Sequence, residues 1–226
     1  MLLTSTETKK LLAISSCELM HKRLAGEIIF TKKSNSYHYE INDNQLLLKL
    51  PLAQQLINWY QKKHPIDINN QPQSDKSISS IIMMTEKILS PISKSLGEIE
   101  ITYGFTSTEL TRFILKNSSQ GTYPPIDQHS ASEKNTAGNQ ICKRGGIACD
   151  FIVKDHQDKV PLIIQFIVGN LDYDKIYYYG NNRPLHVSVN SKPEKHLQIM
   201  NLSENGKRIP GLKAYADKAI ILANEL

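Results

Sequence analysis

The apolar pattern between Asp75 and Leu96 is the feature of this sequence that most constrains its fold. Seven apolar side chains recur there at helical spacing, which predicts one amphipathic helix. They are Ile78, Ile81, Ile82, Ile88, Leu89, Ile92 and Leu96. Pro91 lies inside the pattern and should kink the helix, and Gly97 should end it as a cap residue. With 40% hydrophobic and 22% charged residues, the chain has the composition of a globular protein.

The segments after this helix predict a small sheet. Glu98–Tyr103 alternates like a half-buried strand, and Thr106 and Glu109 form a capping box for a helix that runs to about Asn117. Apolar runs predict three further strands and one helix: strands 148–153, 175–179 and 185–189, and helix 160–168. Strands at both ends of one helix, followed by a hairpin, favour an α+β fold. In such a fold, helices pack on one face of a small antiparallel or mixed sheet.

The first part of the chain gives mixed signals. Its expected elements are two helices and two short strands: helices 8–21 and 52–63, and strands 27–31 and 37–41. The polar segment Asp67–Ser74 has the composition of a loop or linker. We therefore predict an N-terminal α/β extension, residues 1–72, that packs on the core, and a second domain, residues 73–226, that carries the chemistry.

The net charge of the chain is +5, and the basic excess lies in its first part. Residues 1–95 hold 12 basic and 8 acidic side chains, whereas residues 96–226 hold 15 and 14. Four basic pairs contribute to this excess: Lys9-Lys10, Lys22-Arg23, Lys32-Lys33 and Lys62-Lys63. Such pairs are typical of a solvated face, and nucleic-acid binding is the alternative interpretation.

The sequence gives no sign of secretion or of membrane insertion. No run approaches the roughly 20 apolar residues that span a bilayer, and the N-terminus lacks the basic and apolar regions of a signal peptide. Three cysteines are an odd number, which favours a reducing compartment over a disulfide scaffold. We therefore expect a cytoplasmic protein with no membrane partner.

Three polar residues stand out in the second domain. Asp150 and His186 interrupt apolar strands, and His129 lies in a polar segment, 117–146, that is long enough to be a functional loop. Two imidazoles and one carboxylate make the three-ligand set of a catalytic zinc ion, which keeps a fourth position for water. The alternative is structural, because a polar residue in a strand is often a hydrogen-bonded core residue.

Six motifs lie in order between residues 88 and 189: Ile88–Ile92 with Leu96-Gly97, Ile99–Ser107, Asp127-Gln128-His129, Gly146–Phe151, Tyr173–Ile176 and Leu185–Ser188. Together they resemble the zinc D-Ala-D-Ala carboxypeptidase family, which includes phage-type murein endopeptidases and shares its fold with the hedgehog signalling domain. Asp127-Gln128-His129 is similar to Ser-Gln-His of that family, and the next two ligand motifs are similar to Gly-x-Ala-x-Asp and Val-His-Val-Ser. The resemblance implies a hedgehog-like fold and one zinc ion bound by His129, Asp150 and His186.

The chain departs from this family in three respects. His129 and Asp150 are 21 positions apart, so that residues 130–145 look like an insertion. Thr106 stands where the family has the arginine that binds the substrate carboxylate, and a hydroxyl cannot replace a bidentate guanidinium. Arg183 stands where the family has the glutamate that acts as general base, whose loss costs roughly 100–10,000-fold in rate.

Other residues near the expected zinc could replace these functions. Glu133 follows His129 by four positions, so on a helix it would lie on the same face and could act as base or orient the imidazole. Arg183, Lys143 and Arg144 could bind an anionic group such as a phosphate at the mouth of the site, where Thr106 would also meet the substrate. The alternative is that these residues are ordinary solvated loop and turn positions.

The sequence thus predicts a zinc-dependent, peptidase-like hydrolase with altered specificity, acting on a small-molecule or peptide substrate. One alternative is a non-catalytic binding module of the same fold that recognises an anionic partner, a nucleic acid or a nucleotide. Another is a structural protein in which the three residues form a hydrogen-bonded core. Cys149 should be a core residue because it faces away from Asp150, whereas Cys142 could be a loop thiol, a metal ligand or half of a bridge to Cys149.

Overall fold

The computed structural model describes residues 1–62, 67–117 and 128–226, and these divide into two compact units, Met1–Pro51 and Leu52–Leu226. From the sequence this boundary was expected near residue 72. The described residues 52–62 and 67–72 belong to the larger unit, in which Asn70 is buried. Its side-chain amide donates to the carbonyl oxygens of Ile57 and Phe105, at 2.6 and 2.8 Å.

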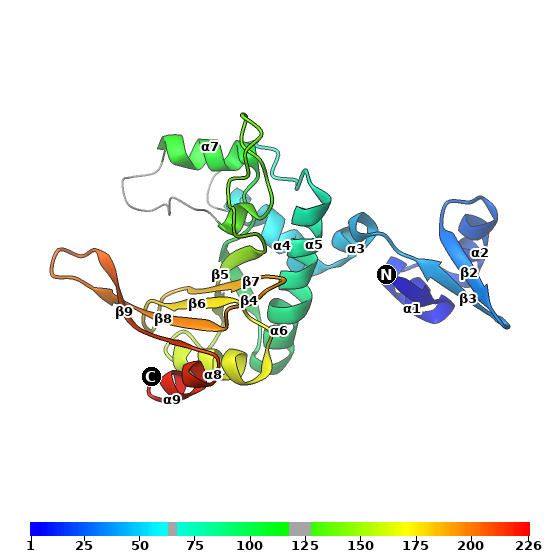
Figure 1. Cartoon of the computed structure of the whole chain (residues 1–226). Helices are drawn as coiled ribbons and strands as arrows, with labels where there is room; N and C mark the ends of the chain where they lie inside the picture. The colour runs from blue at the N-terminus through cyan, green and yellow to red at the C-terminus, as the bar shows by residue number, and fades with distance from the viewer. Residues whose placement is uncertain (63–66, 118–127) are drawn as a thin grey trace. The chain divides into compact units, whose positions relative to one another are not determined.

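The smaller unit is an antiparallel sheet of strand order β1-β3-β2 with helices on the connections (Figure 1). Its elements are β1 (Leu2–Thr4), α1 (Ser5–Leu12), α2 (Ser16–Leu24), β2 (Ile29–Lys33), β3 (Ser36–Glu40) and α3 (Asp43–Lys49). The predicted single helix over 8–21 is wrong, because left-handed Ala13 ends α1 and a capping box between Ser15 and Glu18 starts α2. Leu19, Ile28 and Tyr39 are buried in this unit.

The larger unit begins with helices and continues as alternating strands and helices. Its helical elements are α4 (Pro51–Asn58), η1 (Trp59–Lys62), α5 (Asp75–Met84), η2 (Thr85–Leu89), α6 (Ser90–Leu96), α7 (Thr108–Asn117), η3 (Gln128–Ser130), α8 (Val160–Asn170) and α9 (Asp217–Asn224). Its strands are β4 (Ile99–Tyr103), β5 (Ile147–Val153), β6 (Lys175–Tyr178), β7 (Leu185–Val189), β8 (His196–Leu202) and β9 (Arg208–Tyr215). The described residues thus form a mixed α and β structure, consistent with the predicted α+β class.

The strands form one sheet of order β4-β5-β7-β6-β8-β9. All neighbours are antiparallel except β6 and β8, which are parallel, so the sheet is mixed, one of the two forms that were expected. The elements β8, β9 and α9 were not predicted from the sequence. Side chains alternate along β5: Cys149 and Phe151 are buried on one side, and Asp150 lies between them on the other, half-buried side.

The helical segment 75–96 runs without interruption through a π turn rather than breaking at its proline. The π turn η2 precedes Pro91, which occupies the first turn of α6. Proline has no amide hydrogen to donate, and a wider turn before it accommodates that loss without ending the helix. The helix α5 packs against β5 and β7, and α9 packs against β8 and β9. Within the described ranges, no helix combines the length and the apolar character needed to span a bilayer.

Candidate metal centre

Two of the three predicted ligands come from neighbouring strands of the sheet. Asp150 of β5 and His186 of β7 are directly opposite each other in the antiparallel register, so both side chains lie on the same face. Tyr103 of β4 is opposite Asp150, and Tyr177 of β6 is opposite His186. One row across the sheet therefore carries a carboxylate and an imidazole between two phenols. Strand alternation places Asp150, His186 and Tyr177 in this row, and a register shift between Ile101 and Tyr103 brings Tyr103 into it.

The third predicted ligand comes from the short helix η3. His129 is buried, and its Nδ1 lies 3.1 Å from the carbonyl oxygen of Gly104. A carbonyl only accepts hydrogen bonds, so Nδ1 carries the proton and donates it, which leaves Nε2 with the lone pair of the neutral ring. This Nε2 lies 3.7 Å from Asp150 Oδ1. The backbone thus turns the ligand nitrogen of His129 toward the carboxylate.

The main chain at Gly104, whose carbonyl contacts His129, packs closely against α4 and η1. A Cβ atom at Gly104 would lie 2.3 Å from the carbonyl oxygen of Leu56 and 2.7 Å from Cδ1 of Trp59, so only glycine fits. On the other side, the amide of Thr106 donates to the carbonyl oxygen of His129 at 3.1 Å. The segment 104–106 therefore fixes both the main chain and the ring of His129.

The three side chains suit a metal ion by donor type, and their ligand atoms lie near one another. One ligand atom from each of His129, Asp150 and His186 lies within 4.8 Å of the others. Ligands about 2.1 Å from a tetrahedral zinc ion are roughly 3.4 Å apart, close to the 3.7 Å separation of His129 Nε2 and Asp150 Oδ1. His186 Nδ1 and Asp150 Oδ1 are only 2.6 Å apart, a strong hydrogen bond. In a tetrahedral zinc site this pair would be roughly 0.8 Å further apart.

Aromatic rings surround the cluster. The ring of Tyr103 meets the edge of His129 at a centroid distance of 4.4 Å, and the ring of Tyr177 lies 5.1 Å from that of His186. Burial raises the pKa of Tyr179 to about 12, and the negative charge of Asp150 adds to this effect. A phenol with such a pKa stays protonated at neutral pH and is a hydrogen-bond donor. These tyrosines were not predicted as site residues. Regular strand register would have pointed to Tyr177, whereas Tyr103 lies opposite Asp150 only because of the register shift in β4.

Glu133 lies in a different environment from the one expected. The premise of a helix through Gln128–Asn135 is wrong, because the 3-10 helix η3 ends at Ser130. The Glu133 side chain is 2% exposed, and its Oε1 accepts a hydrogen bond from the amide of Gln73 at 3.1 Å. This contact ties the segment that follows His129 to the residue just before the Ser74 cap of α5.

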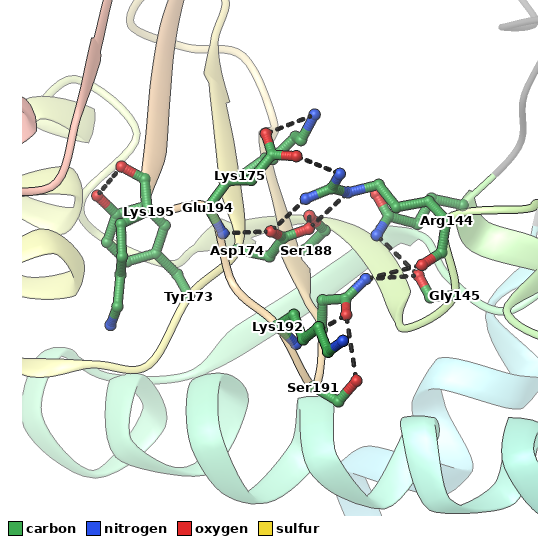
Figure 2. Close-up of polar contacts among 12 residues, drawn as sticks. Arg144, Gly145, Tyr173, Asp174, Lys175, Ser188, Ser191, Lys192, Glu194 and Lys195 are labelled. Carbon is green, nitrogen blue, oxygen red and sulfur yellow. Dashed lines mark hydrogen bonds and ion pairs between the residues drawn. The ribbon is translucent and has the colours of Figure 1, made fainter.

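Arg144 is held by acidic side chains, as Figure 2 shows. Its guanidinium donates to both carboxylate oxygens of buried Asp174, at 3.0 and 2.6 Å, and also to Glu194. The Glu194 amide donates to Asp174 at 2.8 Å, and Lys175 Nζ lies 3.2 Å from the Glu194 carboxylate. In this arrangement the guanidinium of Arg144, which was expected to bind a substrate anion, is engaged by two carboxylates of the chain itself. Arg144 links the loop before β5 to the segments that directly precede β6 and β8.

The remaining expected site residues differ in exposure. Thr106 is fully buried, and its Oγ1 is hydrogen-bonded to Ser130 Oγ at 2.8 Å, so it is no surface contact for a substrate. It is not the cap of α7 either, because Ser107 Oγ accepts the amide of Leu110. Lys143 and Arg183 are both exposed. Asp127 of the Asp127-Gln128-His129 motif lies outside the described residues.

The cysteines are free thiols. Cys149 is buried, as predicted for the face of β5 opposite Asp150, and this burial raises its pKa well above that of an ordinary thiol. Cys142 is also buried, and neither forms a disulfide. Cys17 of α2 is exposed.

Comparison with known protein families, with curated proteins and with solved structures finds no match. The resemblance to the zinc carboxypeptidase family thus depends on the motifs of the chain and on the cluster they produce.

Proposed function

We propose that the larger unit is a metal-dependent hydrolase with a single zinc ion held by His129, Asp150 and His186, in a hedgehog-like fold. The observation that carries this proposal is the convergence of three ligand atoms, within 4.8 Å, from η3, β5 and β7. A zinc ion with three protein ligands supplies an activated water molecule and a Lewis acid. The carbonyl of Gly104 orients His129, and the cross-strand pairing holds Asp150 beside His186.

The tyrosines next to the cluster suggest how the chain would assist hydrolysis. Tyr179 is protonated at neutral pH, as an ordinary tyrosine is, and burial raises its pKa further, to about 12. A protonated phenol beside the site can donate a hydrogen bond to the oxygen on which negative charge develops. In the carboxypeptidase family that the motifs resemble, an arginine binds the carboxylate of the substrate peptide. Here Thr106, which stands at that position, is buried, and Arg144 is hydrogen-bonded to Asp174, so neither replaces that arginine. We therefore propose a substrate other than a D-Ala-D-Ala terminus.

Glu133 is the candidate base, and one variant tests it. Glu133→Gln keeps the size of the side chain and the acceptor for the Gln73 amide. If Glu133 is the base, this variant keeps its zinc and loses turnover. If Glu133 only ties the His129 segment to the α5 terminus, turnover is retained.

Metal analysis of the full chain, purified without chelator, tests the zinc site. We expect about one zinc ion per chain in the native protein and a loss of most of it in His186→Ala, since two ligands hold zinc weakly. His156→Ala removes a histidine of the same unit outside the cluster and should leave the zinc content unchanged. Native protein without zinc, which also gains no thermal stability when zinc is added, would refute the proposal.

One observation favours a second candidate, a non-catalytic module that binds an anionic partner. Within the described residues, the cluster contains a single carboxylate, Asp150, and the candidate base Glu133 is buried against the Gln73 amide. The exposed Lys143 and Arg183 would then contact the partner. Zinc content of one ion per chain, with no turnover of any ester, amide or phosphoester tested, would favour this alternative.

A further inference from the structure

The smaller unit contains two helices that meet at a tight turn. Ala13 has the left-handed φ of 54°, and the amide of Ile14 donates to the carbonyl oxygen of Lys9 at 3.1 Å, so α1 ends there. Ser15 then caps α2, and its side chain accepts the amide of Glu18. Only residues 13–15 separate the helices. Two helices joined by a turn of three residues are the arrangement of a helix–turn–helix, whose second helix enters the DNA major groove.

A β-hairpin is fixed beside the second helix. Arg23 of α2 lies over the ring of Tyr37 in β3, with Cζ 3.8 Å from the ring centroid, and donates to the Tyr39 hydroxyl at 3.4 Å. It also lies 5.8 Å from the ring centroid of Phe30 in β2. These contacts hold α2 and the hairpin as one surface, which Figure 1 shows as α2 next to β2 and β3.

The charge on this surface suits a polyanion. Lys32 and Lys33 are exposed at the end of β2, just before the hairpin turn at Ser34. Of the five acidic residues of this unit, at least three have local partners, whereas Glu40 of β3 is exposed. Glu7 and Glu18 complete the capping boxes of α1 and α2, and Glu27 pairs with Lys22 at 2.8 Å. Within the fully described segment 1–51, neither Lys32 nor Lys33 forms an ion pair with a carboxylate.

The outer side of α2 is exposed from its first turn onward. The exposed residues are Ser16, Cys17, Glu18, Met20, His21 and Leu24, and the one acidic side chain among them, Glu18, is bound to the helix start in the capping box with Ser15. Two large apolar side chains of α2 face solvent: Leu24 is 72% exposed and Met20 is 40% exposed. Such side chains can contact base edges and thymine methyl groups in a major groove.

We propose that the unit Met1–Pro51 binds duplex DNA, with α2 in the major groove and the β2–β3 hairpin along the adjacent phosphates. Double-stranded RNA fits less well because its major groove is too narrow for a helix. Single strands are usually bound by stacking on open aromatic rings, whereas the Tyr37 ring is covered by Arg23. This inference does not depend on the metal centre.

Fluorescence anisotropy of the full chain with a labelled, mixed-sequence duplex of 30 base pairs tests the proposal. Without a specific site, we expect a Kd on the order of 10⁻⁴–10⁻⁶ M near physiological salt, and an affinity that falls linearly with salt on log scales at about −0.9 per phosphate contacted. The double variant Lys32→Glu and Lys33→Glu should lower the affinity at least about tenfold and flatten the slope by about 2. The double variant Lys94→Glu and Lys218→Glu makes the same charge change at exposed positions of the larger unit and should bind like the native chain.

A variant at the start of α2 tests the helix without harming the fold. Ser16→Glu places a carboxylate in the first helical turn, which stabilises the helix through its dipole, and beside Lys9, whose Nζ contacts Ser16 at 2.8 Å. Its melting temperature should therefore be unchanged or higher, while its affinity for the duplex should fall at least about tenfold through repulsion from phosphates.

The exposed thiol of Cys17 reports on the same helix without a mutation. It is the exposed one of the three cysteines, so a thiol reagent should modify it selectively in the native protein. Saturating duplex should slow this reaction severalfold, and the Lys32→Glu, Lys33→Glu variant should lose the protection. The proposal is overturned if no duplex binding occurs at 50 mM salt and 100 µM protein, if the control pair weakens binding equally, if single-stranded DNA or RNA binds more tightly, or if Cys17 stays fully reactive in the complex.

Discussion

Removal of the Asp174 carboxylate should destabilise the larger unit by about 3 kcal/mol. Asp174 is completely buried, and it accepts two hydrogen bonds from Arg144 and one from the Glu194 amide. Breaking a buried ion pair on one side costs roughly 3–5 kcal/mol, because the remaining charge is left without its partner. The Arg144 side chain is 26% exposed, so water recovers part of this cost in Asp174→Ala. The lower end of the range is therefore the expected value.

Urea denaturation of four proteins measures this effect: the native chain, Asp174→Ala, Arg144→Met and the double variant. Asp174→Ala should lose about 3 kcal/mol, and Arg144→Met, which leaves a fully buried carboxylate without its partner, should lose more, within the roughly 3–5 kcal/mol range. The double variant should lose clearly less than the sum, with a coupling of about 2 kcal/mol. Glu98→Ala removes the partner of Lys154 in an exposed ion pair and should change the free energy of unfolding little. Strictly additive losses in the double variant would refute the proposed buried pairing.

The pH dependence gives a second measurement of the same pair. Burial by itself would raise the pKa of Asp174, but hydrogen bonds from Arg144 and from the Glu194 amide outweigh it, so the pKa lies below that of a free aspartate. The ionised pair therefore stabilises the fold above the unfolded-state pKa of about 3.9, and this contribution is lost as the pH falls through the lower folded-state value. The stability difference between the native chain and Asp174→Ala should thus be full at pH 7 and shrink below pH 4. A difference that grows on acidification would contradict this assignment.

Two further predictions concern the site and its frame. Zinc at about 100 times its Kd should raise the melting temperature of the native chain by roughly 5–10 °C, and a chelator should reverse the shift. The melting temperature of His186→Ala should not rise. Equal shifts in both proteins would show that the ion binds elsewhere. Gly146→Ala should prevent accumulation of folded protein, because Gly146 has φ of 68° and a Cβ there would lie 1.8 Å from the carbonyl oxygen of Val189. Gly138→Ala, with a similar φ but nothing within 4 Å, should remain folded and lose about 1 kcal/mol, which soluble expression and urea denaturation can compare.

The central strands of the candidate site were predictable from the sequence. Alternation along β5 and β7 places Asp150 and His186 on one face, and their antiparallel register brings them together. His129 was predictable only through its motif, because a residue in a long polar segment has no periodicity that fixes its position. The role of Gly104 as its hydrogen-bond acceptor depends on a tertiary contact that no local pattern indicates.

Other features were missed or misplaced for physical reasons. The division between α1 and α2 contains no glycine or proline, so the apolar spacing looked continuous, although Ser15 and Glu18 form a capping box that marks the second start. The Asn205-Gly206 pair is a hairpin signal that would have revealed β8 and β9. Arg144 could not be distinguished from a ligand-binding arginine, because Asp174 and Glu194 are 30 and 50 positions further along the chain.

The acceptor that orients His129 belongs to the main chain, and this has a consequence for how the centre tolerates change. Substituting a neighbouring side chain cannot delete the carbonyl oxygen of Gly104. Most point mutations should therefore leave the proton of His129 on Nδ1. The arrangement is vulnerable at Gly104 itself, where any larger residue would collide with Leu56 and displace the oxygen. Variation around the centre can therefore alter what enters it while the nitrogen offered by His129 remains the same.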